Sequence, residues 1–253
     1  MKKMWEIKQS ANQNAIDMHI YGDVQRDYFD WLKFDVVESE TSANYFRQEL
    51  AKYPDVSQIN IYINSCGGSV FEGEAIYNQL KRHPAQKNVY IDGYACSVAA
   101  TIAMCGDKVV MPKNTKMFIH EAWNVAAGNP TQLRKAADDL DVINEGNRQA
   151  YLQKSNGKIA EQKLIELLRA ETWLTAEQCI EYGFADEYAE NDVDMAQAKS
   201  MLEQVNQSLE QHVKYHTSIA EQFKQLISEK EVIENQQAQQ ENKLQKLFAA
   251  LTR

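Results

Sequence analysis

The chain has 253 residues, of which 44% are hydrophobic and 25% are charged, and its formal net charge at pH 7 is -9. The composition is that of an ordinary soluble protein, and the length suits one large domain or a domain with an appendage. Nucleic acids and anionic membranes attract cationic surfaces, so the acidic balance argues against both as partners. Residues 1–17 lack the apolar run of a signal peptide, and no run reaches the roughly 18–20 apolar residues of a membrane span. We therefore expect a cytoplasmic protein.

The cysteines are scattered along the chain and form no CxxC pair: Cys66, Cys96, Cys105 and Cys179. Isolated cysteines in a reducing compartment pack as small hydrophobic side chains. The five histidines are not near them in sequence, so no cluster of zinc ligands is indicated. We expect buried thiols, no metal and no cofactor.

Strand and helix signals alternate through residues 1–190. Strands are expected at 15–24, 58–65, 88–95, 108–112 and 116–120. Helices are expected at 69–83, 97–106, 129–157, 159–169 and 175–183. Pro130 suits the first turn of the longest helix and Gly157 suits its end, while Thr175 and Gln178 form a capping box. The alternation predicts an α/β domain with mainly parallel strand pairing.

Residues 191–253 differ in character from the body. They contain no glycine or proline, are rich in Gln, Glu and Lys, and carry apolar residues spaced alternately three and four apart. This heptad pattern predicts a long helix, or a pair of helices, that oligomerises or docks in the manner of a coiled coil. Polar residues interrupt the middle of the pattern, so a solvated and partly disordered tail remains the alternative.

Two glycine-containing turns, 64–70 and 92–98, each follow a strand and precede a helix. Such a junction directs backbone N–H groups and the positive end of the helix dipole toward one spot. An oxyanion that forms during acyl transfer would be stabilised there. Neither GxGxxG nor GxxxxGK[ST] is present, so nucleotide binding is not indicated.

Three residues are candidates for chemistry. Ser97 begins a helix, His120 ends a strand, and Glu171 precedes a strongly capped helix. Taken singly, each has a structural explanation: a helix cap, a structural histidine and a carboxylate that favours the helix dipole. Together they occur in the order serine, histidine, acid, which a nucleophilic triad adopts on unrelated folds.

Four stretches carry a resemblance to a known family. "YINSCGGSVFEGEAIYNQLKRH", "DGYACSVAATIAMCGDKVVMP", "KMFIHEAW" and "ETWLTAEQCIEYGFADEY" resemble successive motifs of the ClpP family of serine peptidases. The resemblance spans roughly residues 15–188. It implies a ClpP/crotonase-type fold, with a repeated ββα core and outer helices, for a domain of residues 1–190. Residues 191–253 form the separate helical tail.

The resemblance implies a role for each motif residue. Ser97 matches the nucleophile and His120 the general base, while the backbone N–H groups of Gly68 and Val98 match the oxyanion donors. Glu171 matches the third triad position, where the family usually has aspartate. A carboxylate with a longer side chain can still hold an imidazole if its reach is compensated.

The turn after the second expected strand is implied to bind substrate. An extended substrate strand is expected to pair with the backbone of Gly67, Gly68, Ser69 and Val70 by β-augmentation. Cys66 stands where the family usually has proline, and Cys96 stands where it usually has alanine. Neither departure removes a catalytic group.

Within the family, the motifs are most similar to those of the head maturation proteases of tailed phages. This similarity implies an ATP-independent serine endopeptidase that cleaves capsid or scaffolding protein, and itself, in the host cytoplasm or prohead. The helix at 129–156 resembles the family's handle, which implies a heptameric or double-heptameric ring. The alternatives are a housekeeping peptidase fed by an ATPase, a crotonase-type acyl-CoA enzyme, and a scaffold with an inactive protease body.

Overall fold

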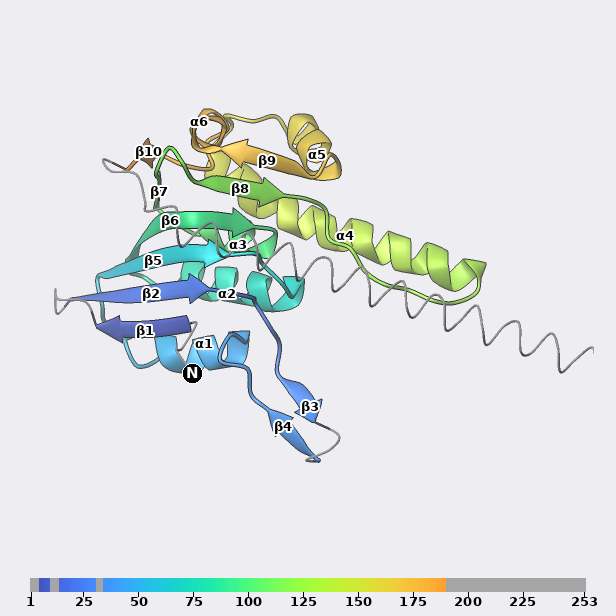
Figure 1. The fold of residues 1–253 in the computed structure, drawn as a ribbon, viewed down its shortest axis with the longest axis horizontal. Helices are drawn as coiled ribbons and strands as arrows, with labels where there is room; N and C mark the ends of the chain where they lie inside the picture. The colour runs from blue at the N-terminus through green and yellow to red at the C-terminus, as the bar shows by residue number, and fades with distance from the viewer. Residues whose placement is uncertain (1–4, 10–13, 31–33, 190–253) are drawn as a thin grey trace, which may run out of the picture. The chain divides into compact units, whose positions relative to one another are not determined.

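The computed structural model describes residues 5–9, 14–30 and 34–189, and the predicted tail lies outside this part of the chain. The described residues form one sheet of eight strands and a small hairpin. Along its main path the sheet runs β1 (Trp5–Gln9), β2 (Ala15–Tyr21), β5 (Gln58–Ser65), β6 (Gln86–Cys96), β7 (Lys108–Met111) and β10 (Glu187–Tyr188), as Figure 1 shows. The hairpin consists of β3 (Tyr28–Asp30) and β4 (Asp35–Val37).

The sheet branches at β6. The first half of this long strand pairs with β7 through 88–90, and its second half pairs with β8 (Lys116–Ile119) through 94–96. Strand β8 then pairs with β9 (Thr172–Thr175). The pairs β2–β5, β5–β6, β6–β7 and β6–β8 are parallel, whereas β1–β2 and β8–β9 are antiparallel. The prediction of an α/β fold with mainly parallel pairing is therefore confirmed.

One face of the sheet packs against helices to form the core. Alternate residues of β2 and β5, including Ile16, Ile20, Ile59 and Ile63, are fully buried, as period-two side-chain alternation requires. The helices are α1 (Ala43–Leu50), α2 (Val70–Arg82), α3 (Val98–Ala103), α4 (Pro130–Ser155), α5 (Glu161–Arg169) and α6 (Ala176–Glu181). The small residues of α3 are buried between the sheet and α2 and α4, which explains its composition.

Helix α4 begins and ends where the sequence predicts. Asn129 caps it by accepting hydrogen bonds from the backbone of Thr131 and Gln132, with Pro130 in its first turn. Asn156 ends it in the left-handed region, followed by Gly157 at φ +81°. The first half of α4 is largely exposed and projects beyond the sheet in Figure 1.

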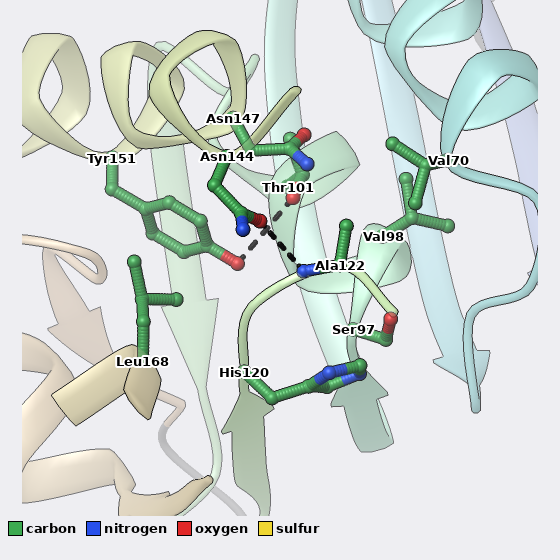
Figure 2. A pocket seen from close by; sticks show the side chains of 10 residues that line it. All are labelled: Val70, Ser97, Val98, Thr101, His120, Ala122, Asn144, Asn147, Tyr151 and Leu168. Atoms are coloured by element: carbon green, nitrogen blue, oxygen red, sulfur yellow. Dashed lines mark hydrogen bonds between the residues drawn. The ribbon is translucent and has the colours of Figure 1, made fainter. Parts of the chain in front are cut away.

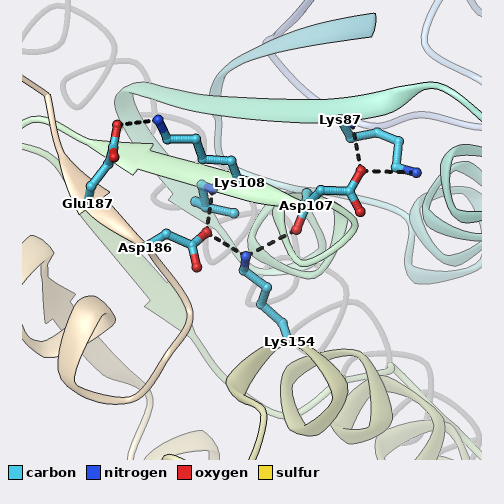
Figure 3. Close-up of polar contacts among 8 residues, drawn as sticks. Lys87, Asp107, Lys108, Lys154, Asp186 and Glu187 are labelled. Atoms are coloured by element: carbon cyan, nitrogen blue, oxygen red, sulfur yellow. Dashed lines mark hydrogen bonds and ion pairs between the residues drawn. The ribbon is translucent and has the colours of Figure 1, made fainter. Parts of the chain in front are cut away.

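The other end of α4 is fastened to the sheet by an ion-pair cluster (Figure 3). Lys154 Nζ lies 2.6 Å from Asp186 Oδ2 and donates to the Gly106 carbonyl oxygen at 3.1 Å. The same Asp186 oxygen accepts from the Val109 backbone N–H of β7. Because the Lys154 side chain is only 8% exposed, solvent screens this pair less than a surface pair. The cluster therefore holds the C-terminal end of α4 against β7.

The second face of the sheet carries a polar and aromatic ladder. The rings of His19, Tyr62 and Tyr90 stack across β2, β5 and β6, with centroids 4.8 Å and 5.1 Å apart. Tyr21 donates a hydrogen bond to Asp92 beside them. These side chains are half-buried, which fits a strand pattern with apolar residues on one face only.

Asp92 gives the fold a pH dependence. Burial raises the pKa of this carboxyl above its ordinary value of 3.8, against the opposing effect of the Tyr21 hydrogen bond. The folded state thus holds its proton more tightly than the unfolded state. The stabilisation that the protonated Asp92 carboxyl adds to the free energy of unfolding is present below the unfolded pKa and is lost as pH rises through the folded pKa.

We expect Asp92→Asn to flatten the fall in unfolding free energy above pH 4, as measured by urea denaturation at pH 4–7. Identical pH profiles for variant and wild type would contradict this.

Several elements were not expected from the sequence: β1, the β3–β4 hairpin, α1, β9 and β10. The expected helix at 97–106 is shorter, because α3 ends at Ala103. No helix in the described part of the chain has the length and apolarity needed to cross a membrane.

Candidate active site

The two glycine turns meet at one edge of the sheet. Strands β5 and β6 are parallel neighbours, and Ser65 pairs with Ala95 just before each chain turns away. Gly67 makes this contact possible. A Cβ atom at Gly67 would lie 2.6 Å from the Cys96 carbonyl oxygen and 2.7 Å from Ser97 Cβ, so only glycine allows the close approach.

Ser97 occupies an unusual backbone conformation between β6 and α3. Its φ is +55° and its ψ is -131°, a combination that a non-glycine residue adopts only when its surroundings impose it. Its N–H donates to the Phe118 carbonyl oxygen of β8 at 2.7 Å. The Ser97 side chain makes no capping hydrogen bond with α3, so the structural explanation for this hydroxyl as a helix cap is wrong.

Two backbone N–H groups near Ser97 have no acceptor among the described residues. They belong to Val98, in the first turn of α3, and to Gly68, which is exposed at φ +141°. The neighbouring groups are used differently: Gly67 O accepts from Val24 N at 2.7 Å, and Ser69 N donates to Val24 O at 2.8 Å. Val24 therefore covers one edge of this turn, and the N–H of Gly68 is left on the other edge.

His120 directly follows β8 and lines the same pocket as Ser97 (Figure 2). Its Nδ1 lies 2.6 Å from the Glu121 carbonyl oxygen. A carbonyl oxygen only accepts, so Nδ1 carries the proton and Nε2 of the neutral ring keeps its lone pair. This is the tautomer that a general base needs. In the described part of the chain, no hydrogen bond joins the imidazole to Ser97 Oγ, as is often the case before substrate binds.

The structure places Glu171 across the strand pair from His120 but not in the pocket. In the antiparallel β8–β9 ladder, Ile119 pairs with Thr172, so the next register position puts Glu171 opposite His120. Glu171 has φ +49° and is exposed, and its side chain hydrogen-bonds to no described residue. Its predicted role in orienting His120 stays a prediction.

The pocket beside Ser97 has walls of two kinds. Apolar side chains come from Val70, Val98, Ala122 and Leu168. Polar side chains come from Thr101 of α3 and from Asn144, Asn147 and Tyr151 of α4. The Asn144 side chain also accepts a hydrogen bond from the Ala122 N–H at 2.7 Å, which ties the segment after His120 to α4. Of these residues, only Val70 and Val98 were predicted from the sequence, because nothing in a helical pattern marks which residues face a distant strand.

The cysteines near the site are not activated. All four are free; Cys66 is half-buried and the others are buried. Burial raises the pKa of the Cys66 thiol to about 11. At neutral pH it is therefore protonated and a poor nucleophile. Among the described residues, no cluster of histidine, cysteine or acidic side chains is arranged to hold a metal ion.

Alkylation tests this directly. We expect iodoacetamide at pH 7 to leave Cys66 unmodified in the folded protein, because the reactive thiolate is scarce at a pH so far below the pKa. Peptide mapping by mass spectrometry would measure the modified fraction, with the urea-unfolded protein as the positive control. Rapid modification of Cys66 in the folded state would contradict this expectation.

The sequence of this chain matches a family of known proteins. Residues 37–192 match the family model described as Clp protease. This is more than half of the chain, and the protein therefore belongs to the Clp protease family, a family of serine peptidases.

Two relatives illustrate the likeness. The chain is 29% identical over 148 residues to the ATP-dependent Clp protease proteolytic subunit 2 of Thermobifida fusca (strain YX). This match covers 56% of this chain and 70% of the relative. The chain is 25% identical over 189 residues to the ATP-dependent Clp protease proteolytic subunit 1 of Protochlamydia amoebophila (strain UWE25), covering 71% and 90% respectively.

Proposed function

We propose that the protein is a serine endopeptidase with Ser97 as nucleophile, His120 as general base and Glu171 as the residue that orients the base. The observation that carries the proposal is the position of Ser97. It lies in an imposed backbone conformation beside an imidazole and two free backbone N–H groups. These are the parts that acyl transfer requires.

The reaction would proceed in two halves. Ser97 Oγ attacks the peptide carbonyl carbon while His120 Nε2 takes its proton, and the N–H groups of Gly68 and Val98 hold the oxyanion. The intermediate collapses to an acyl-enzyme when the protonated imidazole gives that proton to the leaving amine. Water then attacks the ester, with the same histidine as base, and releases the acid product and free Ser97.

Substrate would bind as an extended strand at the Gly68 edge. The Val24 N–H already donates to Gly67 O, and Val24 O already accepts from the Ser69 N–H. Gly67 and Ser69 therefore shape the turn from the edge that Val24 covers. The exposed backbone of Gly68 is the part available for β-augmentation, and Val70 contributes a wall of the pocket.

The direct test is labelling with a fluorophosphonate, which forms a covalent adduct only with an activated serine. We expect one adduct per chain by intact mass, located at Ser97 by peptide mapping. Labelling at another serine, or no labelling of the assembled protein, would contradict the proposal and favour a scaffold with an inactive protease body.

Glu171 is tested through its charge. We expect Glu171→Gln to lower kcat on the order of 10²-fold or more, because the amide keeps the shape but loses the charge that stabilises an imidazolium. Glu171→Asp should retain more activity than Glu171→Gln if the carboxylate reaches His120. Equal activity of both variants and wild type would show that the Glu121 carbonyl alone orients the ring.

The biological role that we propose is cleavage of capsid or scaffolding protein without ATP, in the host cytoplasm or prohead, with removal of the protein's own tail. Its support is the resemblance of the motifs to head maturation proteases. The second candidate is a peptidase that works with an ATPase, which the names of the two relatives favour. Proteolysis of purified capsid or scaffold protein by the isolated chain, without nucleotide, would decide between them.

We also propose a homo-oligomeric ring. Large apolar side chains are exposed on α4 and on the segment before it, notably Leu133, Val142, Trp123 and Val125. Exposed apolar surface of this kind is typical of a protein interface. Light scattering coupled to size exclusion would give the subunit number, and a monomer at working concentrations would contradict the ring.

A further inference from the structure

The pocket beside Ser97 is positioned to receive a substrate side chain. It opens next to the nucleophile and Val98, and it extends across α3 toward α4 (Figure 2). The residue on the acyl side of the cleaved bond carries its side chain on the Cα atom bonded to the attacked carbonyl carbon. Its side chain would therefore be the first to enter the pocket.

The far part of this pocket is polar, and some of its hydrogen-bonding groups have no partner among the described residues. The Asn147 carboxamide makes no hydrogen bond with any described residue, and its Oδ1 is buried without a donor. In Figure 2 the amide lies beside Thr101 and above the pocket. Rotation about its terminal bond exchanges the two ends, so this group can offer a donor or an acceptor.

Tyr151 adds a hydroxyl at the same place. Its side chain is fully buried, and its oxygen accepts a hydrogen bond from Thr101 Oγ1 at 3.4 Å. Burial raises the pKa of this phenol, so it keeps its proton at neutral pH. The proton has no acceptor among the described residues, and the hydroxyl is therefore free to donate.

We propose that this pocket selects glutamine on the acyl side of the cleaved bond, an inference that rests on the proposed peptidase function. The methylene groups of glutamine match the walls formed by Val70, Val98 and Leu168. Its carboxamide both donates and accepts, which complements Asn147 and Tyr151. A methionine of similar length would leave both groups unpaired.

Charged side chains are excluded by the same geometry. None of the residues that line the pocket is an acid, a lysine or an arginine. A glutamate or lysine would therefore be buried without a counter-charge, which is costly. The pocket thus distinguishes glutamine from its nearest apolar and its nearest charged analogue.

Binding to Ser97→Ala tests the pocket without requiring turnover. We would measure dissociation constants of three blocked hexapeptides, identical except for glutamine, methionine or glutamate at the acyl-side position. Glutamine should bind about tenfold more tightly than either, as expected when a site built for hydrogen bonds meets an analogue lacking them. Equal binding, a preference for methionine, or no binding of any peptide would overturn the proposal.

A pair of variants locates the effect. Asn147→Leu in the Ser97→Ala background should remove most of the preference for glutamine over methionine. Gln149→Leu removes an exposed amide from the same helix, outside the pocket, and should leave the preference unchanged. If Asn147→Leu leaves the preference intact, Asn147 is not its source and the proposal fails.

The two proposals fail in different ways. A glutamine preference in Ser97→Ala together with no fluorophosphonate labelling of the wild type would keep the pocket and remove the peptidase. Labelling and peptide hydrolysis with a preference for methionine would keep the peptidase and remove the assigned selectivity.

Discussion

A Ser97→Ala variant is expected to lose peptide hydrolysis by a factor of about 10⁴ or more in kcat, because no other group at the site can form the acyl-enzyme. Cys66 is protonated at neutral pH and Cys96 is buried, so neither thiol can replace the lost hydroxyl. The measurement is steady-state hydrolysis of a fluorogenic peptide by variant and wild type at equal concentration of assembled protein.

Ser57→Ala provides the control for this loss. Ser57 is an exposed serine just before β5, at the opposite end of that strand from the glycine turn, and its hydroxyl donates to the Asn14 carbonyl oxygen. It should keep the wild-type rate. If Ser97→Ala retains activity within about tenfold of wild type, the nucleophile has been misassigned, since removal of a true one costs far more.

Gly67→Ala is expected to reduce both stability and activity severely. At φ +90° an alanine is strained by about 1–3 kcal/mol. Its Cβ would also lie 2.6 Å from the Cys96 carbonyl oxygen and 3.1 Å from Val98 N, so the β6–α3 turn must move. Because misplacement of a reacting group by about 1 Å costs on the order of 10²-fold in rate, kcat should fall by at least that factor.

Gly157→Ala separates backbone strain from the clash. Gly157 has a similar φ of +81°, but a Cβ there would meet nothing within 4 Å. This variant should therefore lose only the strain contribution, about 1–3 kcal/mol of unfolding free energy, and keep its kcat. Equal destabilisation of the two variants, measured by urea denaturation, would show that the contact between the two turns is not tight.

The residues that the fold brings together at this edge of the sheet were predictable from the sequence because each is marked locally. Gly67 and Gly68 stand at a strand-to-helix turn, Ser97 opens a short helix of small residues, and His120 ends an apolar strand. Parallel strands bring their carboxyl ends to one edge of a sheet, and the parallel pairing of β5 and β6 therefore makes the two turns neighbours.

The floor of the pocket was not predictable in the same way. Asn144, Asn147 and Tyr151 lie on one side of α4, but a polar stripe on an amphipathic helix ordinarily faces solvent. Only the packing of α4 against α3 turns that stripe toward Ser97. Strand β9 was missed for a different reason: it ends at Thr175, which is also the first residue of a capping box, and the helix signal masked the strand.

The strand ladder that carries His120 also determines where the chain can change in length. His120 and Glu171 are held opposite each other by the register of β8 and β9, although the whole of α4 and α5 lies between them in sequence. Residues added to the exposed loops between β8 and β9, such as 124–129, would leave the β8–β9 register intact. One residue inserted within β8 or β9 would turn alternate side chains to the wrong face. We therefore expect natural relatives to vary in length between these strands and not within them.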